Sequence, residues 1–144
     1  MTLIQVAIIN ESQTLTDAEV TSVAQALQTQ VTRDFAPLWN LDVEVVSVRT
    51  GASPDSRQLV LLDNRDQAED LGYHQLTARG LPMGKVFVQT DRQANASWTV
   101  AASHELLEML VDPESNRTVM VQQSVTPDLT WLMLYAYEIC DPCA

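Results

Sequence analysis

Basic residues are scarce in this sequence. Lysine and arginine together number 8, against 19 aspartates and glutamates, and the formal net charge is −11. Proteins that hold nucleic acid by its phosphates need a basic face, so this composition argues against a nucleic-acid partner. An acidic chain is compatible with cation binding, although a solvated acidic surface is the commoner reason for such a charge.

Cysteine is also scarce, and long apolar runs are missing. Cys140 and Cys143 are the two cysteines, too few for a secreted disulfide scaffold. No stretch is long enough to span a membrane. Residues 1–10 contain no basic residue and only a short apolar run, which favours a first strand over a signal peptide. We therefore expect a cytoplasmic protein with no membrane partner.

What the sequence does contain is typical of one globular unit. The 144 residues are 46% apolar and 19% charged, which fits a single domain over residues 1–144. Runs rich in β-branched residues predict strands at 3–9, 41–48, 57–63 and 84–90. Between 64 and 83 the chain is polar and punctuated by glycine, which predicts mostly loop. The C-terminal part predicts a hairpin that turns at residues 126–128.

Two helices complete the pattern. The first is expected to begin at a capping box formed by Thr16 and Glu19, to lay one apolar face on the sheet and to end at Pro37. The second is expected to run from Ser97 to Asp112. The order of elements predicts an α/β (α+β) fold, with a mixed, twisted sheet of about four to five strands, a long backing helix and this second helix.

The second helix carries a narrow polar stripe. At about 100° per residue, His104, Glu105, Glu108 and Asp112 fall within one arc of about 100°, and the large apolar residues of the helix fall outside it. No lysine or arginine lies on this helix. Each like-charge pair of carboxylates costs roughly a few tenths of a kcal/mol when exposed and more when buried.

Two interpretations account for the stripe. It is either the solvated face of an amphipathic helix, or a site where a divalent cation removes the repulsion. Imidazole nitrogen and carboxylate oxygen are natural metal ligands. The narrowness of the stripe, its lack of any cation and the position of His104 one turn from Glu108 favour the metal site.

The segment H-E-x-x-E at 104–108 resembles the H-E-x-x-H helix of zincins. Over most of the chain the order of elements is similar to that of zincin-like metallopeptidases, of which metzincins and gluzincins are two groups. A tighter resemblance links "ASHELLEMLVDP" (102–113) and "YEICDP" (137–142) to uncharacterised, partly phage-associated zincin-like proteins. The resemblance implies a zincin-like fold for the single domain.

The resemblance also implies roles for individual residues. His104 is the first metal ligand and Glu105 the general base, while Glu108 stands where the zincin helix has its second histidine. Further carboxylates are offered as ligands: Asp112, which lies on the stripe, Glu138 and Asp141 from the end of the chain and, if the chain doubles back after Pro113, Glu114.

One imidazole with several carboxylates suits zinc first, and calcium, manganese or iron as alternatives. The resemblance implies a metallopeptidase-like hydrolase that acts on a peptide or protein. Glu108 in place of a histidine adds negative charge, which should weaken that activity. The alternative is a non-catalytic structural or assembly protein of phage or virion type, in which the cation stabilises the fold. For this alternative we expect a virion-associated protein. The sequence sets no oligomeric state.

Three other features carry weaker signals. Cys140 and Cys143 form a C-x-x-C pair that is half a zinc site, a redox pair or two incidental thiols, and we favour incidental thiols or a local disulfide. His74 lies in the predicted loop, where a lone histidine most often faces solvent. Trp98 and Trp131 are expected in the core.

Overall fold

The computed structural model describes residues 2–49, 52–66, 72–127 and 129–140. Its elements are, in chain order, β1 (Ile4–Asn10), α1 (Asp17–Gln30), the π-helical turn η1 (Val31–Phe35), α2 (Ala36–Trp39), β2 (Val43–Val48), β3 (Arg57–Leu62), β4 (Gly72–Leu76), β5 (Pro82–Phe87), α3 (Val88–Gln93), α4 (Trp98–Val111), β6 (Thr118–Thr126) and β7 (Leu129–Ala136). The fold is mixed α/β, as predicted.

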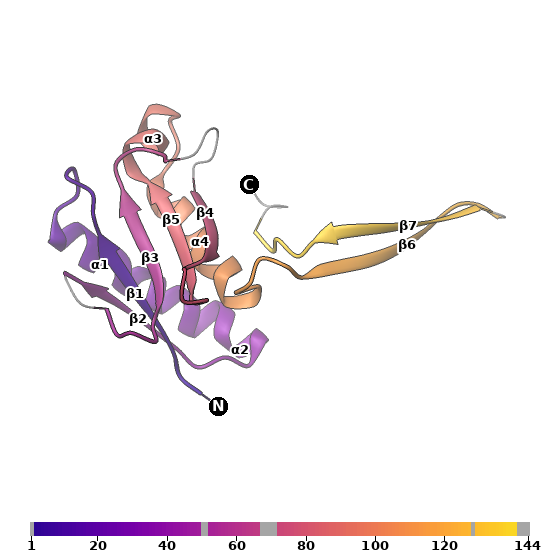
Figure 1. Cartoon of the computed structure of the whole chain (residues 1–144), viewed down its shortest axis with the longest axis horizontal. Coiled ribbons are helices and arrows are strands. Elements are labelled where there is room, and N and C mark those ends of the chain that lie inside the picture. Colours follow the sequence, from indigo (N-terminus) through magenta and orange to yellow (C-terminus); the bar gives the residue numbers. More distant parts are fainter. Residues whose placement is uncertain (1, 50–51, 67–71, 128, 141–144) are drawn as a thin grey trace.

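Five strands form one mixed sheet in the order β2-β1-β3-β5-β4 (Figure 1). β1 pairs in parallel with β2 and β3, and β3 pairs in parallel with β5. β4 is the edge strand and runs antiparallel to β5. The predicted mixed sheet of four to five strands is therefore confirmed.

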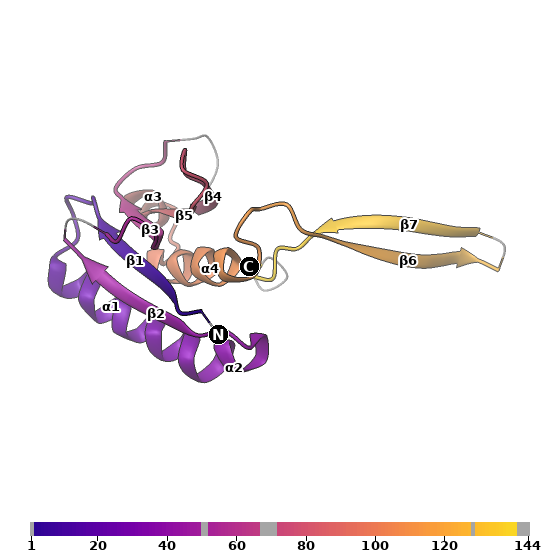
Figure 2. The same ribbon diagram turned by 60° about the horizontal axis from the view of Figure 1, so that its bottom comes forward.

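The two long helices, α1 and α4, pack against the sheet over one continuous apolar core (Figure 2). Val20 and Leu27 of α1 and Leu106 and Met109 of α4 belong to the same cluster as buried strand residues. The helices also touch each other, because Ser103 Oγ donates to Gln30 Oε1 at 2.8 Å. This packing fixes the orientation of α4, the helix with the polar stripe.

The first helix begins as predicted; α1 itself ends at Gln30, but the helical path of the chain continues past Pro37 to Trp39. The Thr16 side chain accepts from the Glu19 backbone N–H at 3.2 Å, and the Glu19 carboxylate accepts from the Thr16 backbone at 2.7 Å. Pro37 does not end the helix, because it lies in the first turn of α2, where a backbone N–H is not needed. The π-helical turn carries the chain into α2, which ends at Asn40 with a φ of 52°.

The segment 64–83, predicted to be mostly loop, contains a strand. β4 occupies Gly72–Leu76 and covers the outer side of β5. The strand predicted at 84–90 is also corrected: β5 ends at Phe87, and Val88 begins the short helix α3. Short strands with glycine at the boundary give little periodic signal, so tertiary pairing decides them.

The C-terminal hairpin forms at the predicted place, with β6 ending at Thr126 and β7 starting at Leu129. It does not join the main sheet but makes a separate two-stranded ribbon that projects from the rest of the chain (Figures 1 and 2). Trp131 is 54% exposed there, so its assignment to the core is wrong, whereas Trp98 is buried as expected. No helix in the described ranges has the length and apolarity needed to cross a membrane.

Candidate metal centre

The acidic residues of α4 are buried. Glu105, Glu108 and Asp112 are 6%, 3% and 2% exposed. The stripe is therefore not a solvated face, and the first of the two interpretations is wrong. Buried carboxylates are costly unless a positive charge or hydrogen-bond donors compensate them. The groups that surround each carboxylate therefore decide the chemistry of the cluster.

Two glycines make room for Glu105. A Cβ atom on Gly72 of β4 would lie 2.8 Å from Glu105 Oε1, and one on Gly84 of β5 would lie 3.3 Å from Glu105 Cβ. Both distances are shorter than ordinary van der Waals contact. The two strands therefore present bare backbone to α4 at the point where the Glu105 side chain lies.

His74 completes this part of the site from the edge strand. It pairs with Gly84 in the antiparallel register, and its side chain is 6% exposed. Its Nδ1 lies 3.5 Å from Glu105 Oε2 and 3.9 Å from Glu108 Oε2. The expectation that His74 faces solvent is therefore wrong: β4, which the sequence did not reveal, turns it towards α4.

The acidic surroundings change the protonation of His74. The Glu105 carboxylate, as the nearest acceptor for the ring N–H, raises the pKa of His74 above 6.5, and the charges of Glu138 and Glu108 add to this. Burial acts in the opposite direction but does not cancel the effect. The carboxylates around His74 therefore favour its protonated, positively charged form.

Glu108 also faces a second group of side chains. His104 Nε2 lies 3.2 Å from Glu108 Oε1, one turn apart on α4. The same oxygen accepts the backbone N–H of Cys140 at 3.1 Å, which draws the segment after β7 against the helix. The His104 side chain is 22% exposed, so the cluster reaches solvent on this side.

Two sets of three ligand-type residues result. One contains His104, Glu108 and Cys140, and the other His74, Glu105 and Glu108; in each set the ligand atoms lie within 4.8 Å of one another. Glu108 belongs to both. The chain thus contains groups that could hold a metal ion. Cys140, which the sequence favours as an incidental thiol or half of a local disulfide, lies in one of these sets, and Cys143 lies outside the described residues.

The remaining predicted ligands differ in their positions. Asp112 belongs to neither set: its Oδ2 accepts the Arg117 backbone N–H at 2.7 Å, which shapes the turn after α4. Glu138 is close enough for its charge to raise the pKa of His74. Asp141 lies outside the described residues. As metal ligands, all three stay predictions.

Asp91 of α3 is a buried carboxyl that no motif or spacing singled out. It is 0% exposed, and neither carboxyl oxygen has a hydrogen-bond partner within the described ranges. Burial, with a smaller contribution from the charge of Glu105, raises its pKa from 3.8 to about 6. Asp91 therefore adds a titratable group beside Glu105 near neutral pH.

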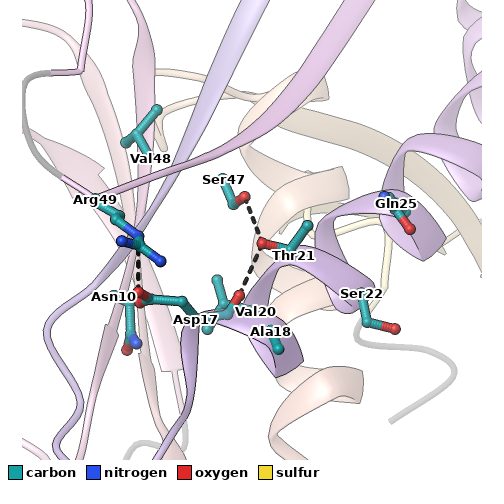
Figure 3. A pocket seen from close by; sticks show the side chains of 10 residues that line it. All are labelled: Asn10, Asp17, Ala18, Val20, Thr21, Ser22, Gln25, Ser47, Val48 and Arg49. Carbon is teal, nitrogen blue, oxygen red and sulfur yellow. Dashed lines mark hydrogen bonds and ion pairs between the residues drawn. The ribbon is translucent and has the colours of Figure 1, made fainter.

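A surface hollow elsewhere has no such chemistry. It lies between α1 and the strands β1 and β2, and Figure 3 shows its lining. Arg49 pairs with Asp17 at 2.8 Å, and Thr21 Oγ1 lies 3.2 Å from Ser47 Oγ. None of the described residues of α4 or β4 lines it. Since these four side chains pair with one another, we place the candidate site at the α4 cluster.

Comparison with protein-family models, with curated proteins and with solved structures finds no match to this chain. The function proposed for the chain therefore rests on the geometry of the cluster.

The fit of Glu105 against the glycines gives a first prediction. Gly72→Ala should push the Glu105 carboxylate away from its place beside His74, because the added Cβ would lie 2.8 Å from Oε1. Glu105 is the main cause of the raised pKa of His74. An NMR titration of the His74 ring should therefore give a lower pKa in Gly72→Ala than in the parent. Gln75→Ala on the same strand is the control and should leave the titration unchanged; an unchanged titration in Gly72→Ala would contradict the packing described.

Proposed function

We propose that this cluster binds one divalent cation, zinc in the first place, and that the protein is a zincin-like, metallopeptidase-like hydrolase of low activity. His104 and Glu108 hold the ion, and Cys140 is the third ligand. Three protein ligands with a fourth position open is the usual arrangement of a catalytic zinc site. The thiol favours zinc or iron over calcium and manganese, which prefer oxygen ligands.

The observation that carries the proposal is the distance between the two ligands on α4. Two ligands at about 2.0–2.1 Å from a tetrahedral zinc lie about 3.3 Å apart. His104 Nε2 and Glu108 Oε1 are 3.2 Å apart. Cys140 is drawn to the same oxygen by its own backbone N–H, so its side chain approaches from a different element.

The remaining residues of the cluster supply acid–base chemistry. A bound cation provides Lewis acidity that polarises a substrate carbonyl. Glu105 is the general base: its carboxylate is buried, lies beside Glu108 and can accept a proton from the attacking water. Protonated His74 balances the charge of Glu105 and can pass a proton onwards. The extra negative charge of Glu108, relative to a histidine, makes the ion a weaker Lewis acid.

One ion per chain is favoured over two. In the set of His74, Glu105 and Glu108, the carboxylates raise the pKa of His74 and so favour its positively charged form. A second divalent cation would have to displace the proton from His74 and lie beside the first ion. The set of His104, Glu108 and Cys140 is therefore the proposed metal site, and His74 with Glu105 is the proton-transfer pair.

A second candidate function rests on the contact between Glu108 and Cys140. Because Glu108 Oε1 accepts the Cys140 backbone N–H at 3.1 Å, an ion bound there would tie α4 to the segment after β7. A structural site of this kind needs no general base and suits a non-catalytic assembly protein of virion type. The two functions differ in what they require of Glu105, so a replacement of Glu105 separates them.

The metal site is tested by its effect on stability. At a free zinc concentration of 100 times the dissociation constant, binding should stabilise the folded chain by about 2.7 kcal/mol, or about 10 °C in Tm for a chain of this size. The zinc-dependent rise should vanish in His104→Ala/Glu108→Ala. Melts in EDTA and in zinc, with a reductant to keep Cys140 as a thiol, give the two Tm values for each variant.

Glu114→Ala is the control, because Glu114 is exposed in the turn just after the same helix and belongs to neither set. It should keep the full zinc-dependent rise. The proposal fails if the double variant and the parent respond equally to zinc, or if the parent melts at the same temperature in EDTA and in zinc.

A further inference from the structure

The hairpin of β6 and β7, here called the arm, has an apolar surface that the candidate metal centre does not explain. Nothing in its two strands is charged, although the chain has a net charge of −11. Nine large apolar residues of the arm are between 39% and 70% exposed: Val119, Met120, Val121, Val125, Leu129, Trp131, Leu132, Leu134 and Tyr135. Figures 1 and 2 show that the ribbon extends away from the main sheet.

Both faces of the arm are apolar. Residues paired directly across an antiparallel ladder share a face. The pair Met120–Leu134 lies on one face with Leu132, and the pair Val119–Tyr135 lies on the other. In the described part of the chain, neither outer edge of the ribbon is paired. Native sheets usually protect such edges with charged residues, and these two strands have none.

The base of the arm contacts the rest of the chain, whereas its two strands project away from it. The Tyr137 backbone N–H donates to Arg117 O at 3.0 Å, which closes the ribbon where it leaves the rest of the chain. Tyr137 also packs edge-on against Trp39, with ring centroids 6.1 Å apart. The arm is therefore held in a defined direction from its base, as a surface prepared for a partner would be.

We propose that the arm is the contact surface for a second copy of this chain, which pairs with it face to face or edge to edge as a two-fold dimer. The exposed parts of these nine residues, counted over both faces of the arm, amount to roughly 700–950 Å², taking large apolar side chains as about 150–200 Å² each. A stable protein–protein interface buries about 800 Å² on each partner. The two faces of the arm together therefore reach the area that a stable dimer needs.

Charge argues for a copy of the same chain over a membrane. The arm has no lysine or arginine to meet anionic lipid headgroups, and the net charge of −11 repels them. Two copies would meet through uncharged strands, so the acidic residues of one copy would not be brought against those of the other. Edge-to-edge pairing of two ribbons also satisfies backbone groups, which makes the contact self-complementary.

The mass of the particle in solution tests the proposal. Sedimentation or light scattering of the parent at micromolar concentration should give twice the chain mass of 16.0 kDa. Leu134→Glu, on the more exposed face of the arm, should shift the particle to the mass of one chain. Leu38→Glu is the matched control: Leu38 is 83% exposed on α2 and gains the same charge, and this variant should remain dimeric.

Hydrogen exchange on the unmutated protein gives a second test that does not depend on a variant folding. Amides of 118–126 and 129–136 should exchange more slowly at high than at low protein concentration, and the amides of β1 and β3 should not change. A monomeric parent, whether or not it binds anionic vesicles, would overturn the proposal. So would a Leu134→Glu variant that stays dimeric, or protection that rises evenly over the whole chain.

Discussion

Glu105→Gln is expected to leave the bound metal in place and to lower any metal-dependent turnover by about 10²-fold or more, the usual effect of removing a general base. The two side chains have the same shape, so the space between Gly72 and Gly84 stays filled. The amide cannot take a proton from water. Since the metal set is His104, Glu108 and Cys140, its composition does not change. Turnover on a panel of peptides and esters and zinc content by elemental analysis are the two measurements.

Glu114→Gln is the control for this experiment, because it removes an equal charge from an exposed position near the same helix. It should keep both zinc and turnover. If Glu105→Gln keeps full turnover, Glu105 is not the base. If no member of the panel is hydrolysed by the parent while zinc binds normally, the structural function is favoured. Robust zinc-dependent proteolysis by the parent would contradict the low activity proposed from Glu108.

Asp91→Asn is expected to stabilise the protein at pH 8 by up to about 3 kcal/mol and to have no such advantage at pH 4. The pKa of Asp91 is raised from 3.8 to about 6 in the folded chain. A difference of about 2 units corresponds to about 3 kcal/mol. As pH rises, the Asp91 carboxyl loses its proton at a lower pH in the unfolded chain than in the folded one. The free energy of unfolding therefore falls between about pH 4 and pH 6, and above pH 6 the folded protein is destabilised by the full amount. Asparagine stays neutral, although its buried amide will offset part of the gain.

Denaturant unfolding in EDTA, at both pH values, measures this effect without metal linkage. His74 also contributes to the pH dependence. Because its pKa is raised above 6.5 on folding, its pairing stabilises the protein below that pH and is lost as pH rises through the folded pKa. The difference between the parent and Asp91→Asn removes this common contribution. Asp42→Asn, at an exposed position, is the control. A parent–variant difference that is the same at both pH values would contradict the assignment to Asp91.

The part of the site that lies on one helix could be predicted from the sequence. The spacing of His104, Glu105 and Glu108 places their side chains on one arc of any helix, whatever its surroundings. The class of fold followed in the same way from the periodicity of the long segments. Local pattern did not decide whether the arc was solvated or buried, because burial depends on which strands cover the helix.

The part of the site that comes from other elements could not be predicted. His74 reaches α4 only because a strand of five residues pairs with β5, and its sequence offers no clear alternation. Gly72 fell in a predicted loop and Gly84 at the start of a predicted strand, and neither position indicated that both glycines leave space for Glu105. Cys140 is 32 residues from Glu108, and only the path of the chain after the arm brings them together.

For the arm, too, the sequence predicted the local elements but not whether their side chains are buried. Its turn and its two strands were predicted from Pro127 and the flanking apolar residues. The apolar content then suggested a core position for Trp131, which is instead 54% exposed. Hydrophobicity indicates that a surface needs covering, but it does not indicate whether the cover comes from the same chain or from another.

The most direct test of the proposed site is the number of zinc ions bound per chain, measured by titration calorimetry together with elemental analysis of the dialysed protein. The parent and His74→Ala should each bind one ion, and His104→Ala/Glu108→Ala should bind none. Two ions in the parent, with one lost in His74→Ala, would make His74 and Glu105 a second metal site and remove the proton-transfer pair. No stoichiometric binding by the parent would contradict the metal centre itself.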